Sequence, residues 1–234
     1  MAANLKQIVG SSILRKQLIA ITGLVMVGFV IAHLAGNLLI LLGPKAFNHY
    51  AETLASLGEL LWVMRFGLLA SVLLHIYLTM QLVIENSRAR AMDYDVTKDH
   101  GDRKMATRAM KYTGIMIVFF LFLHLYDFTF GDKTGQASIV EGLNDGESLG
   151  LFGLVWNSFQ LQHIWRNFIY ILAVSSVGLH LSHAIQSLCQ TMGINHPRYT
   201  PLIKKASMAL GIAVALAFSS IPIYVLLMPK PFGV

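Results

Sequence analysis

Five apolar stretches dominate this chain, and each is long enough to cross the hydrocarbon core of a membrane as a helix of about 20 residues. They lie near residues 18–42, 60–84, 110–130, 165–190 and 203–228. Charged residues make up only 13% of the sequence, about half the share that is usual in a soluble domain. We therefore expect an all-α membrane protein in which residues 1–234 form one domain, a bundle of five transmembrane helices.

The basic residues predict how this bundle lies in the membrane. Thirteen of the 18 Lys and Arg residues lie before the first stretch, around the second connection or in the fourth, whereas the other five border the opposite ends. The positive-inside rule then places the N-terminus in the cytoplasm and the C-terminus outside. The net charge of +6 comes from these membrane borders, so it does not indicate nucleic-acid binding.

Each of the first four apolar stretches carries a histidine in its interior: His33, His75, His124 and His180. An ionisable side chain inside hydrocarbon is costly, so it indicates a functional site. Neutral imidazole is a common axial ligand of haem iron, and two imidazoles complete a six-coordinate iron suited to electron transfer. The chain has a single cysteine, which excludes the Cys-x-x-Cys-His motif of covalently attached c-type haem. The histidines therefore predict two haem b groups.

The depth of each histidine along its helix sorts the four into two pairs. With a rise of about 1.5 Å per residue, His33 and His124 lie about 20 Å from the predicted cytoplasmic ends of their helices, and His75 and His180 about 15 Å. We call His33 and His124 the outer pair, and His75 and His180 the inner pair. Two stacked bis-histidine sites would provide an electron path between the membrane faces. His183, one turn after His180, is the rival ligand in the fourth helix.

Two further sets of residues suit bound haem. Gly36, Ser71 and Ser176 lie one turn from His33, His75 and His180 and leave room for a flat macrocycle, although close helix packing would also explain them. Haem propionates are anionic and need cationic or hydrogen-bonding partners near the interface. The candidates at the cytoplasmic border are Ser12, Arg15, Lys16, Arg108 and Tyr112. The positive-inside rule alone would also place basic residues there.

Several short motifs, in their order and spacing, resemble the cytochrome b membrane subunit of succinate:quinone oxidoreductases, the family of succinate dehydrogenase and fumarate reductase. More narrowly, the chain is similar to the single-subunit, five-helix, two-haem type found in many menaquinone-using bacteria. The matching segments span nearly the whole chain and are residues 22–23, 32–37, 74–75, 122–126, 179–180 and 191–193.

The resemblance implies ligands, partners and a location. In that family the first and third helices hold the haem far from the soluble subunits, and the second and fourth hold the near one, which gives the same two pairs. The interval from the ligand to the following glycine favours His180 over His183. A flavoprotein subunit and an iron–sulfur subunit are implied on the cytoplasmic face of a bacterial cytoplasmic membrane, with menaquinone as the membrane substrate. Some members carry a glutamate linked to proton transfer where this chain has Gly178.

Quinone chemistry needs a proton donor or acceptor beside the quinone ring and near a haem. If the outer haem serves the quinone, the site lies at the outer ends of the first two helices, where the family's proton-handling glutamate also falls. Glu52 and Glu59 are the candidates, and Glu59 is favoured because it borders the second helix. The alternatives are that both are solvated loop charges, or that the quinone binds on the cytoplasmic side near Gln17 and Arg108.

Two other functions would also place histidines in membrane helices. A cytochrome b subunit of a hydrogenase or formate dehydrogenase also uses membrane histidines, but places them differently among its helices. A proton-coupled transporter relays protons through histidines and carboxylates. The apolar stretches hold few carboxylates besides Asp127, and none is interrupted by a proline before Pro222, which disfavours a transporter.

Overall fold

The computed structural model describes residues 11–89 and 102–231, with the backbone alone for residues 102–108. Five of its helices are long and apolar enough to span a membrane. They are α2 (Ser12–Leu38), which continues as the 3-10 turn η1 (Leu39–Leu42), α4 (Glu59–Arg88), α5 (Asp102–His124), which ends in the π-helical turn η2 (Leu125–Thr129), α7 (Ile164–Thr191) and α8 (Thr200–Leu227). The described residues contain no β-strand beyond one isolated bridge between Ile139 and Ser148. The predicted all-helical class and the five long apolar helices are confirmed.

The helices extend beyond the apolar stretches that predicted them. α2 begins at Ser12 rather than near residue 18, and α4 continues to Arg88. The side chain of Ser11 accepts a hydrogen bond from the backbone N–H of Leu14 at 3.2 Å, as an N-cap residue does. Hydropathy marks the part of a helix that suits a membrane, whereas the backbone hydrogen bonds continue through polar residues with good helix propensity, such as Lys16.

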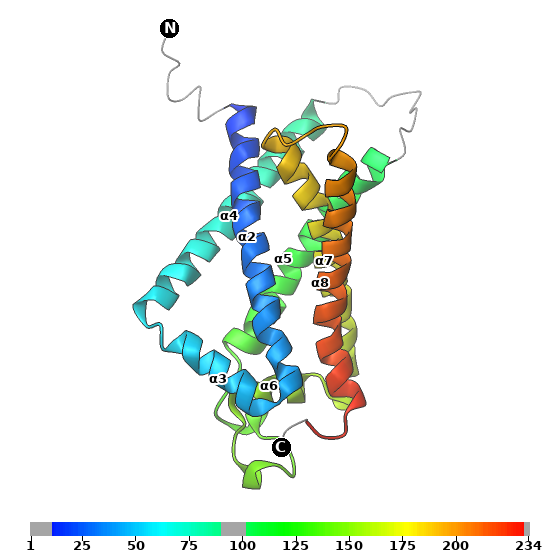
Figure 1. The fold of residues 1–234 in the computed structure, drawn as a ribbon. Coiled ribbons are helices and arrows are strands. Elements are labelled where there is room, and N and C mark those ends of the chain that lie inside the picture. Colours follow the sequence, from blue (N-terminus) through cyan, green and yellow to red (C-terminus); the bar gives the residue numbers. More distant parts are fainter. Residues whose placement is uncertain (1–10, 90–101, 232–234) are drawn as a thin grey trace.

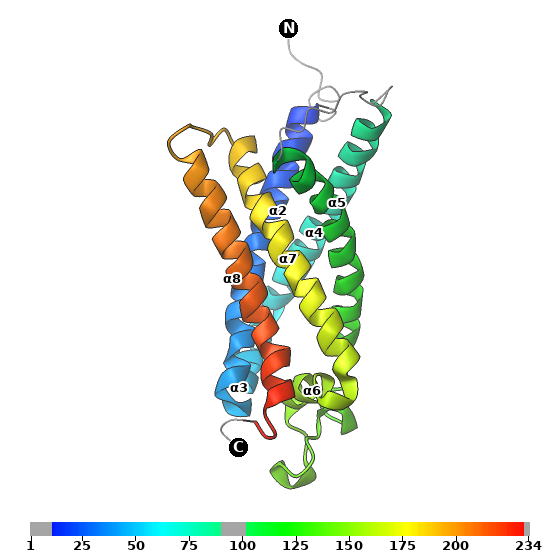
Figure 2. The same cartoon turned by 90° about the vertical axis from the view of Figure 1, so that its right-hand side faces the viewer.

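The bundle has two ends, which we name after the predicted topology. The inner end, at the top of Figure 1, holds the start of α2 and the connection from α7 to α8. The outer end holds α3 (Pro44–Ala55), α6 (Gly150–Ser158) and the end of α8. α7 and α8 share the most extensive contact; α2 packs on α4, α7 and α8, and α5 packs on α7. α4 packs chiefly on α2 and leans away from the other helices toward its outer end (Figure 1). Figure 2 shows α7 and α8 side by side.

A pair of glycines brings α7 and α8 close together. A Cβ atom built on Gly178 would overlap the carbonyl oxygen of Gly211, and a Cβ on Gly211 would overlap the carbonyl oxygen of Gly178. Small residues at a helix crossing let two backbones approach, which is how helices commonly pack inside membranes. The backbone of α8 therefore occupies the space that a side chain at position 178 would need. Some members of the resembled family carry a glutamate at this position.

The outer end is closed by α3 and α6. Pro44 begins α3 at the position where a missing N–H costs nothing, and Phe47 from this helix packs on Phe152 of α6 with ring centroids 6.4 Å apart. Asn48 joins the two helices: its side-chain amide donates to the carbonyl oxygen of Leu149 at 2.8 Å, and its oxygen accepts from the N–H of Phe152 at 3.0 Å. α3 has no counterpart among the helices predicted from sequence.

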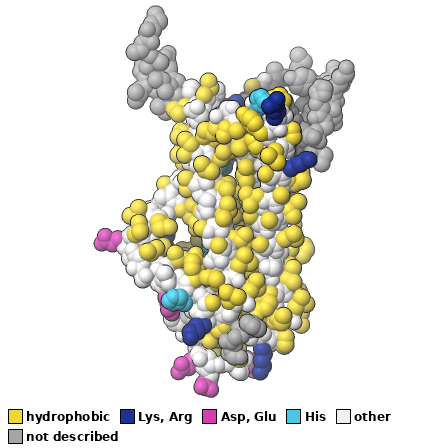
Figure 3. Space-filling view, in the orientation of Figure 1, with side chains coloured by type: hydrophobic (Ala, Val, Ile, Leu, Met, Phe, Trp, Pro, Cys, Tyr) yellow, Lys and Arg dark blue, Asp and Glu magenta, His cyan; other side chains and the backbone are white. Residues whose placement is uncertain are grey.

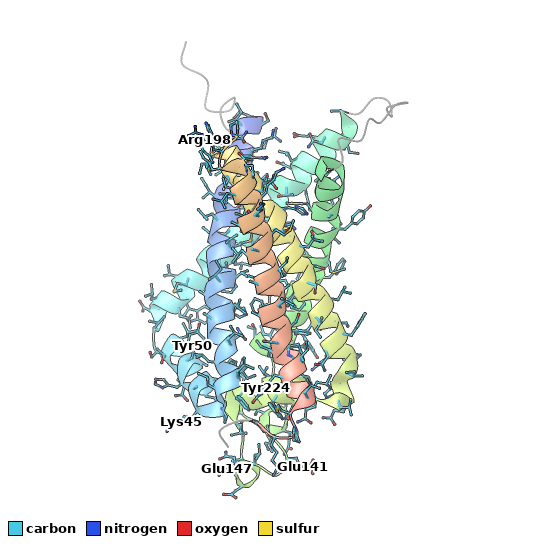
Figure 4. All side chains as sticks on the ribbon, turned by 45° about the vertical axis from the view of Figure 1, so that its right-hand side comes forward. Lys45, Tyr50, Glu141, Glu147, Arg198 and Tyr224 are labelled. Atoms are coloured by element: carbon cyan, nitrogen blue, oxygen red, sulfur yellow. The ribbon has the colours of Figure 1, made fainter. Side chains whose placement is uncertain are left out.

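The surface is apolar along the helices and charged at the two ends (Figure 3). Arg198 marks the inner end in Figure 4, whereas Lys45, Glu141 and Glu147 mark the outer end. Packing along the helices is uneven: 33% of the most apolar window is buried in α7 and in α8, but only 6% in α4 and in α5. α4 and α5 therefore leave much of their apolar surface for lipid or for another bound group.

Candidate functional site

The inner pair consists of His75 on α4 and His180 on α7. Each ring touches a threonine of a neighbouring helix. The Nδ1 atom of His75 lies 3.1 Å from the Oγ1 atom of Thr22 on α2, and the Nδ1 atom of His180 lies 3.1 Å from the Oγ1 atom of Thr113 on α5. These two matching polar contacts join α4 to α2 and α7 to α5.

Each threonine stands beside a glycine that borders the same imidazole. A Cβ atom built on Gly23 would lie 3.5 Å from Cε1 of His75, and one built on Gly114 would lie 3.6 Å from Cε1 of His180. These are ordinary contact distances, so the imidazole rings lie directly against the backbones of α2 and α5. The same Thr-Gly dipeptide therefore serves the same purpose on two helices.

The outer pair meets ring to ring. The imidazole of His33 on α2 and that of His124 on α5 have centroids 5.7 Å apart, with their planes nearly perpendicular at 87°. Aromatic rings surround them. They are Phe29 stacked on His33, Phe218 near His33, and Phe120, Phe128 and Tyr170 near His124. The Nδ1 atom of His124 is buried without a hydrogen-bond partner.

The ring centroids of the outer pair lie about as far apart as those of two imidazoles bound to one metal ion. An imidazole–metal bond is about 2 Å long, which sets two facing nitrogens about 4 Å apart and the ring centroids about 6 Å apart. The observed 5.7 Å fits this spacing.

Neither histidine pair has enough protein ligands for a metal ion by itself. Within the part of the chain that the structure describes, no cluster of three or more His, Cys, Asp or Glu side chains could hold a bare metal ion. A metal held by either histidine pair would need further ligands from elsewhere, and a haem macrocycle supplies four in its plane. The two pairs could therefore hold two haem irons.

One of the small residues predicted to leave room for a macrocycle does not do so. A Cβ atom built on Gly36 would overlap the ring of Tyr50, which reaches from α3 to α2 (Figure 4). The space one turn after His33 is therefore occupied by an aromatic side chain. Ser71 and Ser176 instead donate hydrogen bonds to carbonyl oxygens of their own helices, each at the residue four positions earlier.

The propionate candidates belong to the helices of the inner end, and among those whose side chains the structure describes Arg15 is tied to another helix. Arg15 of α2 forms an ion pair with Glu85 of α4, and both helices also meet at the contact between Thr22 and His75. Ser12, Lys16 and Tyr112 are exposed, and the side chain of Arg108 lies outside the described residues.

The two quinone candidates lie apart on neighbouring elements of the outer end. Glu52 is on α3 and Glu59 is the first residue of α4, and both side chains are exposed. Tyr50, two residues before Glu52, is the side chain of α3 that lies against α2. The structure thus connects α3 with the helix that carries His33, but shows no direct contact between either glutamate and the outer pair.

A buried ion pair beside the outer pair was not among the predicted site residues. Asp127, three residues after His124 in the π-helical turn, has a side chain only 1% exposed. Its carboxylate accepts a hydrogen bond from the hydroxyl of Tyr170 at 2.8 Å and lies 3.1 Å from the guanidinium of Arg166. Arg166 also lines a cavity of about 600 Å³ at the outer end. The sequence signal for this ion pair is an acidic residue, Asp127, inside one apolar stretch and a basic residue, Arg166, at the start of another.

An internal repeat is the sequence signal that could have identified the two threonines. Residues 22–33 and 113–124 both begin with Thr-Gly and both end with His, eleven residues after the threonine. Eleven residues make about three helical turns, so the threonine and the histidine share one helix face. Residues 71–75 and 176–180 both read Ser-Val-x-Leu-His. α2 with α4, and α5 with α7, are thus two equivalent helix pairs.

No protein-family model, curated protein or solved structure matches this chain.

Proposed function

We propose that this chain is the di-haem cytochrome b subunit that anchors a succinate:quinone oxidoreductase in the bacterial cytoplasmic membrane. In this role it carries electrons between an iron–sulfur subunit and menaquinone. The observation that carries the proposal is the arrangement of four histidines, from four apolar helices, as two pairs at two depths of one bundle. Function as a proton-coupled transporter gives no reason for this pairing.

The four histidines divide between two haem b groups. His75 and His180 would hold the inner haem, and His33 and His124 the outer one. A bound haem supplies reversible one-electron redox chemistry. The separation of the two sites follows from α2 itself, because Thr22 touches His75 and lies three turns, about 16 Å, from His33 along the helix. The four helices would thus position two redox centres one above the other across the membrane.

The side chains around the pairs support this role in different ways. The threonines and glycines of α2 and α5 orient the inner imidazoles, and the aromatic rings around His33 and His124 keep water from the outer pair. Glu85 neutralises Arg15 in the present geometry, and together with Ser12, Lys16, Arg108 and Tyr112 this arginine is a candidate partner for the propionates of the inner haem.

The succinate-specific part of the proposal comes from the resemblance in motif order and from the charge pattern. A basic inner end suits a cytoplasmic face, on which the flavoprotein and iron–sulfur subunits would dock. Glu59 and Glu52 are the proposed proton donors or acceptors for the quinone at the outer end. Gly178 faces the backbone of Gly211, so a proton path through a side chain at that position is not proposed for this chain.

The first test is a pyridine haemochromogen assay on the protein purified in detergent. We expect about two haem b groups per chain; a value near zero would overturn the assignment as a cytochrome, and a value near one would overturn the pairing. Identification of the copurifying subunits separates succinate:quinone oxidoreductase from hydrogenase or formate dehydrogenase. A flavoprotein with succinate-dependent quinone reduction is expected.

The quinone residues need a separate test in the whole complex. Glu59→Gln and Glu52→Gln are assayed with quinol analogues and with an artificial electron donor to the soluble subunits. Loss of the quinone-linked activity alone in one variant, with both haems retained, would locate the site. Normal quinone turnover in both variants would move the site to the inner end near Gln17 and Arg108.

A further inference from the structure

Thr22 and Thr113 each form a second hydrogen bond, which determines whether the threonine donates to or accepts from the inner histidine. A threonine hydroxyl has one hydrogen to donate and lone pairs that accept. Thr22 lies 2.7 Å from the carbonyl oxygen of Leu18, and Thr113 lies 2.8 Å from that of Ala109, both in their own helices. Since a carbonyl oxygen can only accept, each hydroxyl hydrogen is used within the helix and each Oγ1 atom is left as an acceptor.

The imidazole nitrogen opposite each hydroxyl must then carry the hydrogen. His75 gives independent evidence, because its Nδ1 atom also lies 3.1 Å from the carbonyl oxygen of Ile19. Two acceptors around one nitrogen require an N–H group there. In neutral imidazole, a hydrogen on Nδ1 leaves the lone pair on Nε2.

We infer that Thr22 and Thr113 are positioning residues that hold His75 and His180 as Nδ1–H tautomers, so that both Nε2 atoms are presented as ligands of the inner haem iron. This inference rests on the proposed function. A hydrogen-bond acceptor at the imidazole nitrogen that does not bind the metal fixes the orientation of the ring and raises the basicity of the nitrogen that does. Greater basicity favours ferric iron, so the two hydroxyls lower the reduction potential of the inner haem.

The outer pair shows that such an acceptor is not a general feature of histidines in this bundle. Nδ1 of His124 is buried without a hydrogen-bond partner, and aromatic rings surround both outer imidazoles. The effect of the two threonines is therefore confined to the inner haem, and the outer haem serves as the reference within the same molecule.

The test replaces each hydroxyl by a methyl group of similar size in the complex purified in detergent. Thr22→Val and Thr113→Val remove the acceptors, and Thr22→Ser and Thr113→Ser restore them. Thr79→Val is the matched control, because Thr79 lies one turn after His75 on the same helix and its buried Oγ1 atom has no hydrogen-bond partner. Haem content, the two reduction potentials and the low-spin ferric EPR signals are measured, and His75→Ala identifies the potential that belongs to the inner haem.

We expect both valine variants to raise the inner potential and change the inner EPR signal, while the outer haem is unaffected. The serine variants and Thr79→Val should behave as wild type. Should a valine variant lose the inner haem, its serine counterpart must retain it with the wild-type potential. An inner potential that does not move, or serine variants that resemble the valine variants, would overturn the inference alone. A wild-type protein without haem would overturn the proposed function as well.

Discussion

The inner and outer histidine pairs of this bundle are held by different kinds of contact. Nδ1 of each inner imidazole meets a threonine hydroxyl at 3.1 Å on a neighbouring helix. The outer imidazoles pack among phenylalanine and tyrosine rings, and Nδ1 of His124 has no hydrogen-bond partner. A hydrogen bond fixes both the orientation and the tautomer of a ring, whereas aromatic packing fixes the orientation alone. Mutations should therefore affect the two pairs through different side chains.

The largest effect should come from removing one ligand of either pair. His180→Ala should lower the haem content from about two to about one per chain, with the inner haem lost, because one imidazole cannot complete the six-coordinate site. His33→Ala should give the same count with the outer haem lost. The pyridine haemochromogen assay gives the count and a redox titration identifies the haem that remains. His183→Ala is the control, and loss of the inner haem there would reassign the ligand on α7.

Removing the buried carboxylate of Asp127 should have the next largest effect, and this effect should be confined to the outer end. Breaking one partner of a buried ion pair costs about 3–5 kcal/mol, and the guanidinium of Arg166 is partly exposed, so Asp127→Ala should destabilise the protein by about 3 kcal/mol. Asp127→Asn should cost less because it can still accept from Tyr170. Thermal unfolding in detergent, followed by the absorbance of each haem, measures both variants.

Glu147→Ala, at an exposed position of the outer end with an ordinary backbone conformation, is the control for this prediction and should leave the unfolding temperature unchanged. Equal destabilisation by both substitutions would mean that the ion pair of Asp127 contributes no more than a surface charge. Loss of the inner haem before the outer one would contradict the assignment of this pair to the outer end.

Replacing one aromatic residue beside the outer pair should have a smaller effect, and only on that pair. Phe128→Leu keeps an apolar side chain next to His124 and should cost about 1 kcal/mol. The outer haem should show a changed reduction potential while the inner one does not. Because Thr22→Val acts on the other pair, the effects of the two substitutions on stability should add to within about 0.5 kcal/mol. A shift of both potentials by either substitution would show that the two pairs are not independent.

The smallest effect is expected from lowering the pH, which should act on the turn of the outer end that contains Asp132. Backbone N–H groups of Thr134 and Gly135 donate to Asp132 and hold its pKa below the ordinary value of 3.8. A lowered pKa stabilises the folded turn above the ordinary pKa, and this contribution is lost as the pH falls through the lowered value. The protection of the Thr134 and Gly135 amides against hydrogen exchange, measured relative to the intrinsic exchange rate at each pH, should therefore fall in acid. Asp132→Asn should remove this pH dependence without changing either haem.

The sequence predicted the five long helices because hydropathy over 20 residues is a strong signal, and it predicted where their apolar parts lie better than where the helices begin. α2 starts at Ser12 because Ser11 can cap it, which hydropathy does not detect. The two depth-matched pairs were predictable from spacing along each helix. The partners of Asp127 were not, since they depend on how α5 and α7 face each other.

The threonines were overlooked for a different physical reason. A threonine in an apolar helix usually bonds to its own backbone, as Thr22 and Thr113 do, so it carries no sign of a second partner. Only the repeat of Thr-Gly with a histidine eleven residues later distinguishes these two positions. Tyr50 illustrates the opposite case: its contact with Gly36 comes from α3, a helix that the apolar pattern does not predict.

The division of the ligands between the two helix pairs has a consequence for how the protein is made. Each histidine pair takes one member from α2 or α4 and the other from α5 or α7, so neither site exists while only the first half of the chain has been synthesised. A chain that stops after α5 contains both outer ligands, His33 and His124, but lacks His180. If the two pairs hold haem as proposed, the ligands of the outer site are complete one transmembrane helix earlier in synthesis than those of the inner site.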